Sequence, residues 1–162
     1  DVFFFCETIE NNIGFGVETA DKESVRRAAG QAFIEKEITS FPLQYETLVG
    51  ERGITLSGGQ KQRISIARAL TKNPELVIFD DCLSAVDSKT ENEIITNLNS
   101  FLYDKTAIII THRIFSLFNF DRIIVLDDGE IAEQGKHGDL IRAKGYYATL
   151  YARQQESNGD TT

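Results

Sequence analysis

The chain has 162 residues, of which 41% are hydrophobic and 26% are charged, and its net charge is −8. This composition predicts an ordinary globular domain and argues against a large nucleic-acid-binding surface, because 25 acidic side chains outnumber 17 basic ones. The apolar runs are much shorter than the ~20 residues that span a membrane, and two cysteines, Cys6 and Cys82, are too few for a disulfide framework and indicate a reducing compartment.

The sequence contains no methionine and opens on the apolar residues 2–5, so we expect a piece of a longer chain.

The first part of the chain is predicted to be helical. Residues 20–32 favour a helix with Asp21 as its N-cap, and a shorter helix is expected before Pro42. No strand is expected in residues 8–50, so residues 8–72 are predicted to form a small helical subdomain.

The second part, residues 73–155, is predicted to alternate strands and helices. A helix is expected over residues 88–102, with Ser88 as a possible cap. Short apolar runs predict strands buried on both faces, and an Asp-Asp-Gly turn leads into a last strand: residues 76–79, 106–111, 122–126 and 131–134. This order predicts an α/β fold, with a thin sheet of three parallel strands, crossover helices and a bare edge. Residues 156–162 are expected to form a frayed tail.

The strongest functional motif consists of Leu56, Ser57, Gly58, Gly59 and Gln60, which lead into a helix that extends to about Lys72. Two glycines allow backbone N–H groups to approach an oxyanion closely. Ser57 adds a hydroxyl donor, and the helix dipole directs its positive end at the ligand. The motif is therefore a candidate anion site, although these residues taken alone favour the alternative, an ordinary helix cap after a glycine turn.

Two further motifs follow predicted strands. Asp80 and Asp81 come after an apolar strand, where α/β proteins bind ligands; Asp80 is a candidate Mg²⁺ ligand and Asp81 a candidate for polarising water. His112 follows the next predicted strand and is a candidate γ-phosphate contact. A solvated acidic turn and a polar strand cap are the alternatives for these two motifs. His137 is interpreted as a surface residue beside a short helix.

In this order, with 23 residues from Ser57 to Asp80 and 32 from Asp80 to His112, the motifs resemble the nucleotide-binding domain of an ATP-binding-cassette (ABC) transporter. Residues 56–60 are similar to the signature loop, residues 76–81 to the Walker B strand and residues 84–87, which end in Asp87, to the D-loop. His112 resembles the switch histidine. Residues 47–53 are similar to the segment that meets the coupling helices of the membrane domain in ABC exporters.

The resemblance implies part of a P-loop NTPase (RecA-like) sheet, with ATP and Mg²⁺ as ligands. The string G-x-x-x-x-G-K-[ST] is missing from the sequence, so we expect the P-loop, the adenine-stacking aromatic residue and the Q-loop glutamine upstream of residue 1. These 162 residues alone are expected to be inactive. The resemblance also implies a head-to-tail dimer with a second ABC ATPase domain. The residues expected to bind nucleotide in it are Leu56, Ser57, Gly58, Gly59, Gln60 and Asp87. The expected location is the cytoplasmic face of the plasma (inner) membrane.

One departure from the family pattern concerns Asp81, because the family usually has glutamate there. A carboxylate that is one methylene shorter reaches the attacking water poorly, so the site is expected to bind ATP but to hydrolyse it slowly, as one half of an asymmetric heterodimeric exporter. Two alternatives remain: a soluble ABC ATPase of chromosome maintenance or translation, and a non-hydrolysing module that dimerises on nucleotide. Cys82 is expected to be a packing residue whose thiol pKa is raised by the neighbouring carboxylates.

Overall fold

The computed structural model describes residues 3–50, 54–115 and 118–159, and of residues 157–159 only the backbone. The chain forms two compact units, residues 1–110 and 111–162, which are treated separately below. No helix in the described ranges is both long and apolar enough to cross a lipid bilayer. The predicted boundary near residue 72, between a helical subdomain and an α/β part, stays a prediction. The two compact units are divided at another place, and the first of them contains both the helical part and two strands.

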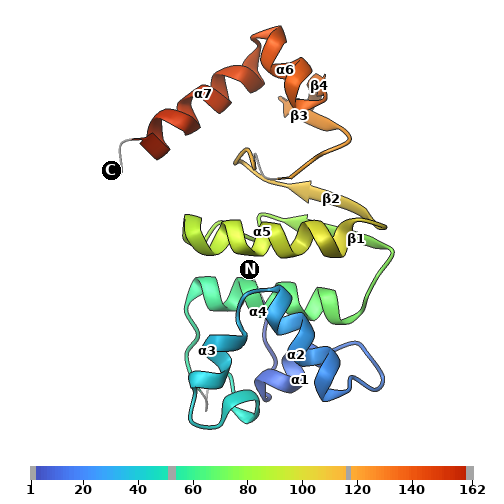
Figure 1. The fold of residues 1–162 in the computed structure, drawn as a ribbon, viewed down its shortest axis with the longest axis vertical. Helices are drawn as coiled ribbons and strands as arrows, with labels where there is room; N and C mark the ends of the chain where they lie inside the picture. Colours follow the sequence, from blue (N-terminus) through green and yellow to red (C-terminus); the bar gives the residue numbers. More distant parts are fainter. Residues whose placement is uncertain (1–2, 51–53, 116–117, 160–162) are drawn as a thin grey trace. The chain divides into compact units, whose positions relative to one another are not determined.

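The first unit begins with helices that pack around one long helix. α1 and α2 lie against α4, and α2 also contacts α5 (Figure 1). The buried side of α4 carries Ile64, Ile66, Ala67 and Leu70, and each large aliphatic side chain contributes about 1.5–3 kcal/mol when it is buried. The elements are α1 (Ile9–Gly14), α2 (Lys22–Gln31), α3 (Glu35–Ser40), the 3₁₀ turn η1 (Gln44–Glu46), α4 (Gly58–Thr71), β1 (Leu76–Asp80), α5 (Ser88–Leu102) and β2 (Thr106–Ile110).

The helix predictions for α2, α3 and α4 are confirmed, and so is Asp21 as a cap. Its carboxylate accepts a hydrogen bond from the Ser24 N–H at 2.7 Å. The sequence analysis missed α1, a six-residue helix with two asparagines in its middle. Asn12 is fully buried there, because its side chain bonds the backbone N–H and C=O of Phe5 at 3.0 and 3.1 Å. Tertiary contacts therefore form α1 where helix propensity does not.

The α/β fold class is confirmed, and of the three strands expected to be parallel, β1 and β2 pair with each other; a shared sheet with the third strand stays a prediction, because that strand belongs to the other unit. β1 pairs with β2 in parallel, whereas β3 (Ile123–Asp127) pairs with β4 (Glu130–Gly135) in an antiparallel hairpin that belongs to the second unit. Asp128 and Gly129 both have positive φ angles, of 46° and 80°, which is the geometry of a two-residue hairpin loop. This local turn gives β3 its hydrogen-bond partner.

The expectation that the strands are buried on both faces is wrong. In β1, Val77 and Phe79 are buried while Leu76 and Ile78 are exposed, Ile78 by 59%. Ile108 and Ile110 of β2 are about half exposed. Within the described residues, β1 has one covered and one open face, since an alternating side-chain period of two sends neighbouring residues to opposite sides, whereas in β2 only Ile109 is partly covered.

The second unit consists of the β3–β4 hairpin, α6 (His137–Ala143) and α7 (Tyr146–Gly159). His137 is the first residue of α6, and its Nδ1 lies 2.8 Å from the hydroxyl of the buried Tyr147. Helix α7 runs to Gly159, so the backbone is helical over residues 156–159, where a frayed tail was expected. No proline or glycine interrupts the helix before Gly159, which explains its length.

Candidate functional site

The residues of the predicted anion site form the start of α4. Leu56 is buried and anchors the segment, while the Ser57 Oγ accepts the Gln60 N–H at 3.2 Å and the Gln60 Oε1 accepts the Ser57 N–H at 2.9 Å. This reciprocal pair is a capping box. The backbone N–H groups of Gly58 and Gly59 have no hydrogen-bond acceptor among the described residues, so two donors remain available at the positive end of a 14-residue helix.

The two glycines have a second role that the sequence analysis missed. A Cβ atom placed on Gly59 would lie 2.9 Å from the backbone oxygen of Ala85, and one placed on Gly58 would lie 3.3 Å from the Ala85 Cβ. The start of α4 therefore packs directly against the loop that follows β1. A side chain at position 59 would force these two segments apart.

A polar network fixes the first turn of α4 from the side of α3. The Glu37 carboxylate accepts a hydrogen bond from the Gln60 Nε2 at 2.8 Å and forms an ion pair with the Arg63 Nη1 at 2.6 Å. Arg63 is 8% exposed and also donates to the backbone oxygens of Phe33 and Gly59, at 2.8 and 3.2 Å. The guanidinium therefore links the α2–α3 connection to the glycine turn.

Gln62 connects α4 to the segment that follows the two aspartates. Its amide nitrogen donates to the Asp81 backbone oxygen at 3.2 Å and to the Ser84 hydroxyl at 2.9 Å, and its oxygen accepts the Ala85 N–H at 2.9 Å. One side chain thus pairs with three groups of the loop over residues 81–85. The spacing of the sequence motifs gave no indication of this contact.

Asp80 and Asp81 lie at the carboxyl end of β1, as predicted. Both side chains are exposed, and neither carboxylate forms a hydrogen bond or ion pair within the described residues. Asp81 has a φ angle of 46°, in the left-handed region that aspartate tolerates better than most residues, and its N–H donates to the Ile110 oxygen at 2.9 Å. In the described part of the chain there is no cluster of three or more His, Cys, Asp or Glu residues that could hold a metal ion, and the role of Asp80 as a Mg²⁺ ligand stays a prediction.

The start of α4 and the aspartates line one pocket. Its volume is about 750 Å³, and it brings together two motifs that lie more than twenty residues apart in the sequence. The lining residues are Gly58, Lys61, Gln62, Ser65, Ile66, Ala69, Ile78, Phe79, Asp80, Asp81, Cys82, Ser84 and Ala85.

Asp87 lies at the N-terminus of α5, where it acts as the helix cap. Its carboxylate accepts the Thr90 N–H at 3.0 Å, and this backbone hydrogen bond is the main reason that the pKa of Asp87 is lowered. The expectation that Ser88 caps this helix is therefore wrong, since Ser88 is already the first helical residue. A contact between Asp87 and nucleotide remains a prediction.

His112 belongs to the second compact unit and is described within it. The residue is exposed and lies in a bend between Thr111 and Arg113, and the Arg113 N–H donates to the Thr111 Oγ1 at 3.0 Å. An exposed imidazole at the end of a strand can contact a ligand, and this role of His112 stays a prediction.

The segment expected to meet a membrane domain, residues 47–53, is described only in its first four residues, because Glu51, Arg52 and Gly53 lie outside the described ranges. Thr47 is buried and its backbone oxygen accepts the Ile9 N–H at 3.0 Å, whereas Leu48 is about half exposed. The visible part is thus anchored to α1 and presents one apolar side chain at the surface.

The Cys82 thiol has a pKa raised to about 12. Burial is the largest cause, and the charges of Asp81 and Asp80 add to it. The expected direction is confirmed, although the sequence analysis named only the carboxylates. Because the folded chain holds this proton more tightly, the contribution to stability is complete below about pH 9 and is lost as the pH rises toward 12.

We predict that Cys82 resists alkylation at pH 8 while the exposed Cys6 reacts. The thiolate is the reacting species, and a raised pKa keeps the Cys82 thiol protonated. Iodoacetamide labelling followed by peptide mass spectrometry measures both residues in one sample, and the denatured chain provides the control in which both react. Equal labelling of the two cysteines in the native protein would contradict the assignment.

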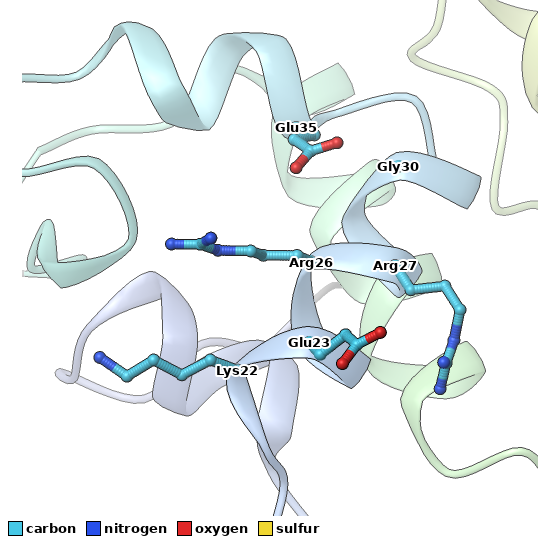
Figure 2. A pocket seen from close by; sticks show the side chains of 6 residues that line it. All are labelled: Lys22, Glu23, Arg26, Arg27, Gly30 and Glu35. Atoms are coloured by element: carbon cyan, nitrogen blue, oxygen red, sulfur yellow. The ribbon is translucent and has the colours of Figure 1, made fainter.

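A second pocket lies on α2 and the start of α3, away from every predicted motif. It measures about 580 Å³ and is lined by Lys22, Glu23, Arg26, Arg27, Gly30 and Glu35. Figure 2 shows that Lys22 and Arg26 extend to one side of α2, whereas Arg27 points to the other side. Three cations interspersed with two carboxylates select no single class of ligand.

Comparisons with known proteins agree with the sequence motifs. A family model described as ABC transporter matches residues 3–84. A probable multidrug resistance ABC transporter ATP-binding/permease protein of Bacillus subtilis is 48% identical over 155 residues, which cover 96% of this chain and 26% of the relative. An ATM1-type heavy metal exporter of Novosphingobium aromaticivorans is 43% identical over 162 residues, covering 100% of this chain and 27% of the relative.

Among solved structures, a bacterial Atm1-family ABC exporter with ATP bound has a TM-score of 0.89 and 44% sequence identity, covering 96% of this chain and 27% of that chain. The chain thus spans about a quarter of the length of the proteins it matches. ABC exporters are ATP-hydrolysing transporters. From the family model and the identity over nearly the whole sequence, we conclude that the chain belongs to the ABC transporter family.

Proposed function

We propose that this chain forms part of the ATP-hydrolysing domain of an ABC exporter and helps to energise transport across a membrane. The observation that carries the proposal is the contact between the start of α4 and the loop after Asp80 and Asp81, which Gln62 holds with three hydrogen bonds. This contact joins an anion-binding helix end and two unpaired carboxylates in one pocket. The helix end suits a phosphate group and the carboxylates suit a magnesium ion, and in the head-to-tail dimer proposed below they serve two different nucleotides, which this contact couples mechanically.

The residues present fit ATP with Mg²⁺ in part. ATP with Mg²⁺, when bound, supplies the phosphoryl group and the neutralising charge that phosphoryl transfer needs. The free N–H groups of Gly58 and Gly59 and the Ser57 hydroxyl would bind phosphate oxygens of a partner domain's nucleotide, and Asp80 would hold the cation of the chain's own site. Asp81 would orient the attacking water and accept its proton, while His112 would contact the γ-phosphate.

The signature segment is proposed to serve the nucleotide of a second ABC domain in a head-to-tail dimer. We further propose that this partner is a different subunit and that the chain's own site is weakened, because Asp81 stands where the family usually has glutamate. Residues 47–53 would meet the coupling helices of a membrane domain, supported by the similarity to exporters along the whole chain. The domain would then lie at the cytoplasmic face of the plasma (inner) membrane. No nucleic-acid partner is expected for a chain with a net charge of −8.

Replacing Ser57 by alanine tests this proposal in the assembled transporter. We expect ATP turnover to fall at least about tenfold, because a hydroxyl donor to the phosphate is lost. The same change also removes a helix cap, which costs about 1 kcal/mol of folding stability. Turnover is measured by phosphate release at saturating ATP.

The matched control is Thr8→Ala, which removes the side-chain cap of α1 outside the pocket. Thr8→Ala should lower the unfolding temperature to a similar extent and leave turnover near the wild-type value. If Ser57→Ala and Thr8→Ala lower turnover equally, the effect of Ser57 is only structural and the anion site is refuted.

The aspartate at position 81, where the family usually has glutamate, favours a second candidate function. In this alternative the chain is a module that dimerises when it binds nucleotide and does not hydrolyse it. In that case ATP binding would persist and phosphate release would stay at background both alone and with a partner subunit. The soluble ABC ATPase alternative is disfavoured, since the relatives named above are a transporter and an exporter.

A further inference from the structure

The side chain of Gln154 forms two hydrogen bonds with the backbone of Ile114, which lies two residues after His112. The Ile114 N–H donates to the Gln154 Oε1 at 2.8 Å, and the Gln154 Nε2 donates to the Ile114 backbone oxygen at 2.8 Å. The carboxamide thus satisfies both polar groups of one peptide residue, as a neighbouring strand would. The two partners are forty residues apart in sequence and belong to the same compact unit.

His112 is therefore fixed from both sides. Before it, the Thr111 hydroxyl accepts the Arg113 N–H at 3.0 Å and closes the bend that contains the histidine. After it, Ile114 is tied to Gln154, and the next residue, Phe115, is buried with its ring 6.1 Å from that of Phe118. The histidine side chain itself remains exposed. This combination of a restrained backbone and an open imidazole is what a ligand contact requires.

Helix α7, which carries Gln154, is anchored independently of this segment. The Glu133 carboxylate of β4 accepts the N–H groups of Tyr146 and Tyr147, at 2.5 and 3.1 Å, at the start of the helix. The Tyr147 hydroxyl is also paired with His137 of α6. Gln154 thus presents its amide from a helix whose position is set by β4 and α6.

We propose that Gln154 is a positioning residue for His112: it fixes the backbone of the His112 segment, so that the imidazole meets the γ-phosphate in a productive orientation. The inference rests on the proposed contact between His112 and nucleotide. The carboxamide of glutamine donates through its nitrogen and accepts through its oxygen at the same time, and both functions are used here. Leucine removes both hydrogen bonds, and glutamate cannot donate to the Ile114 oxygen at neutral pH.

The first test examines the contact itself by hydrogen–deuterium exchange of the complete protein. We expect Gln154→Leu to speed exchange in peptides that contain Ile114, because its N–H loses its acceptor. Gln155→Leu is the matched control, since Gln155 is exposed and its side chain makes no hydrogen bond within the described residues. Unchanged exchange in Gln154→Leu would overturn the inference.

The second test asks whether Gln154 acts through His112, by single-turnover hydrolysis of radiolabelled ATP, which follows even a slow site. Gln154→Leu should lower the rate of hydrolysis about ten- to a hundredfold. The ATP concentration that gives half of the maximal rate should change less than about threefold. Gln154→Glu should lower it as well, and Gln155→Leu should not. In a His112→Ala background, Gln154→Leu should cause no further loss.

The outcomes separate the two hypotheses. If His112→Ala alone leaves the rate unchanged, the proposed nucleotide contact of His112 fails, whatever the exchange data show. If His112→Ala slows hydrolysis and Gln154→Leu lowers the rate additively with it, Gln154 acts elsewhere and the positioning role is refuted. A loss confined to the background that retains His112 supports it.

Discussion

Replacing Asp81 by glutamate is expected to raise ATP hydrolysis at the site around Asp80 by up to about 10²–10⁴-fold, the range that general acid–base catalysis contributes. The added methylene extends the carboxylate toward the attacking water. The left-handed backbone at this position, with φ of 46°, suits aspartate and makes glutamate slightly less favourable for folding. The gain is measured as phosphate release by the complete protein without any partner subunit.

The control for this prediction is Asp128→Glu. Asp128 has the same φ of 46° but lies in the turn between β3 and β4, so it reproduces the backbone strain without the chemistry. Asp81→Asn should bring any residual hydrolysis to background. Brisk hydrolysis by the wild-type protein alone, unchanged by Asp81→Asn, would refute a weakened site.

Replacing Arg63 by methionine is expected to destabilise the first unit by about 3 kcal/mol, at the lower end of the cost of breaking a buried ion pair because Glu37 is partly exposed. The change leaves the backbone oxygens of Phe33 and Gly59 without this donor. It also frees Glu37, which otherwise holds Gln60 of the capping box. We therefore expect both a lower unfolding temperature and weaker nucleotide-driven dimerisation.

Arg27→Met is the matched control, because Arg27 is exposed on α2 and forms no ion pair within the described residues. Differential scanning fluorimetry of the complete protein measures the unfolding temperature. Dimerisation is followed by size-exclusion chromatography with and without ATP. Equal unfolding temperatures for the Arg63 and Arg27 variants would contradict the structural role assigned to this network.

Much of the local structure follows from the sequence, because its signals are local. Asp21 before an apolar-periodic segment and Ser57 with Gln60 three residues later both specify helix starts. The Asp-Gly pair at 128–129 specifies a hairpin turn. The carboxylates at the end of β1 are located by the strand that precedes them.

Long-range side-chain contacts were beyond sequence reasoning. Helix α1 depends on Asn12, whose partners include the backbone of Phe5 and the guanidinium of Arg68, 56 residues away. Gln62 and Gln154 each bind backbone groups of a distant loop, and nothing in their own neighbourhood distinguishes them from surface glutamines. Strand burial was overestimated because a continuous apolar run fits both a strand covered on two faces and one covered on a single face.

The close approach of α4 to the loop after β1 has a consequence for which substitutions can compensate one another. At position 59 the obstacle is the main-chain oxygen of Ala85, which every amino acid carries, so no replacement at position 85 makes room for a side chain there. At position 58 the obstacle is the Ala85 Cβ, so shortening residue 85 to glycine would relieve it. As far as packing is concerned, the two adjacent glycines thus differ in their epistasis: the constraint at position 59 holds in every sequence background, and the tighter fit at position 58 holds only while residue 85 keeps a side chain.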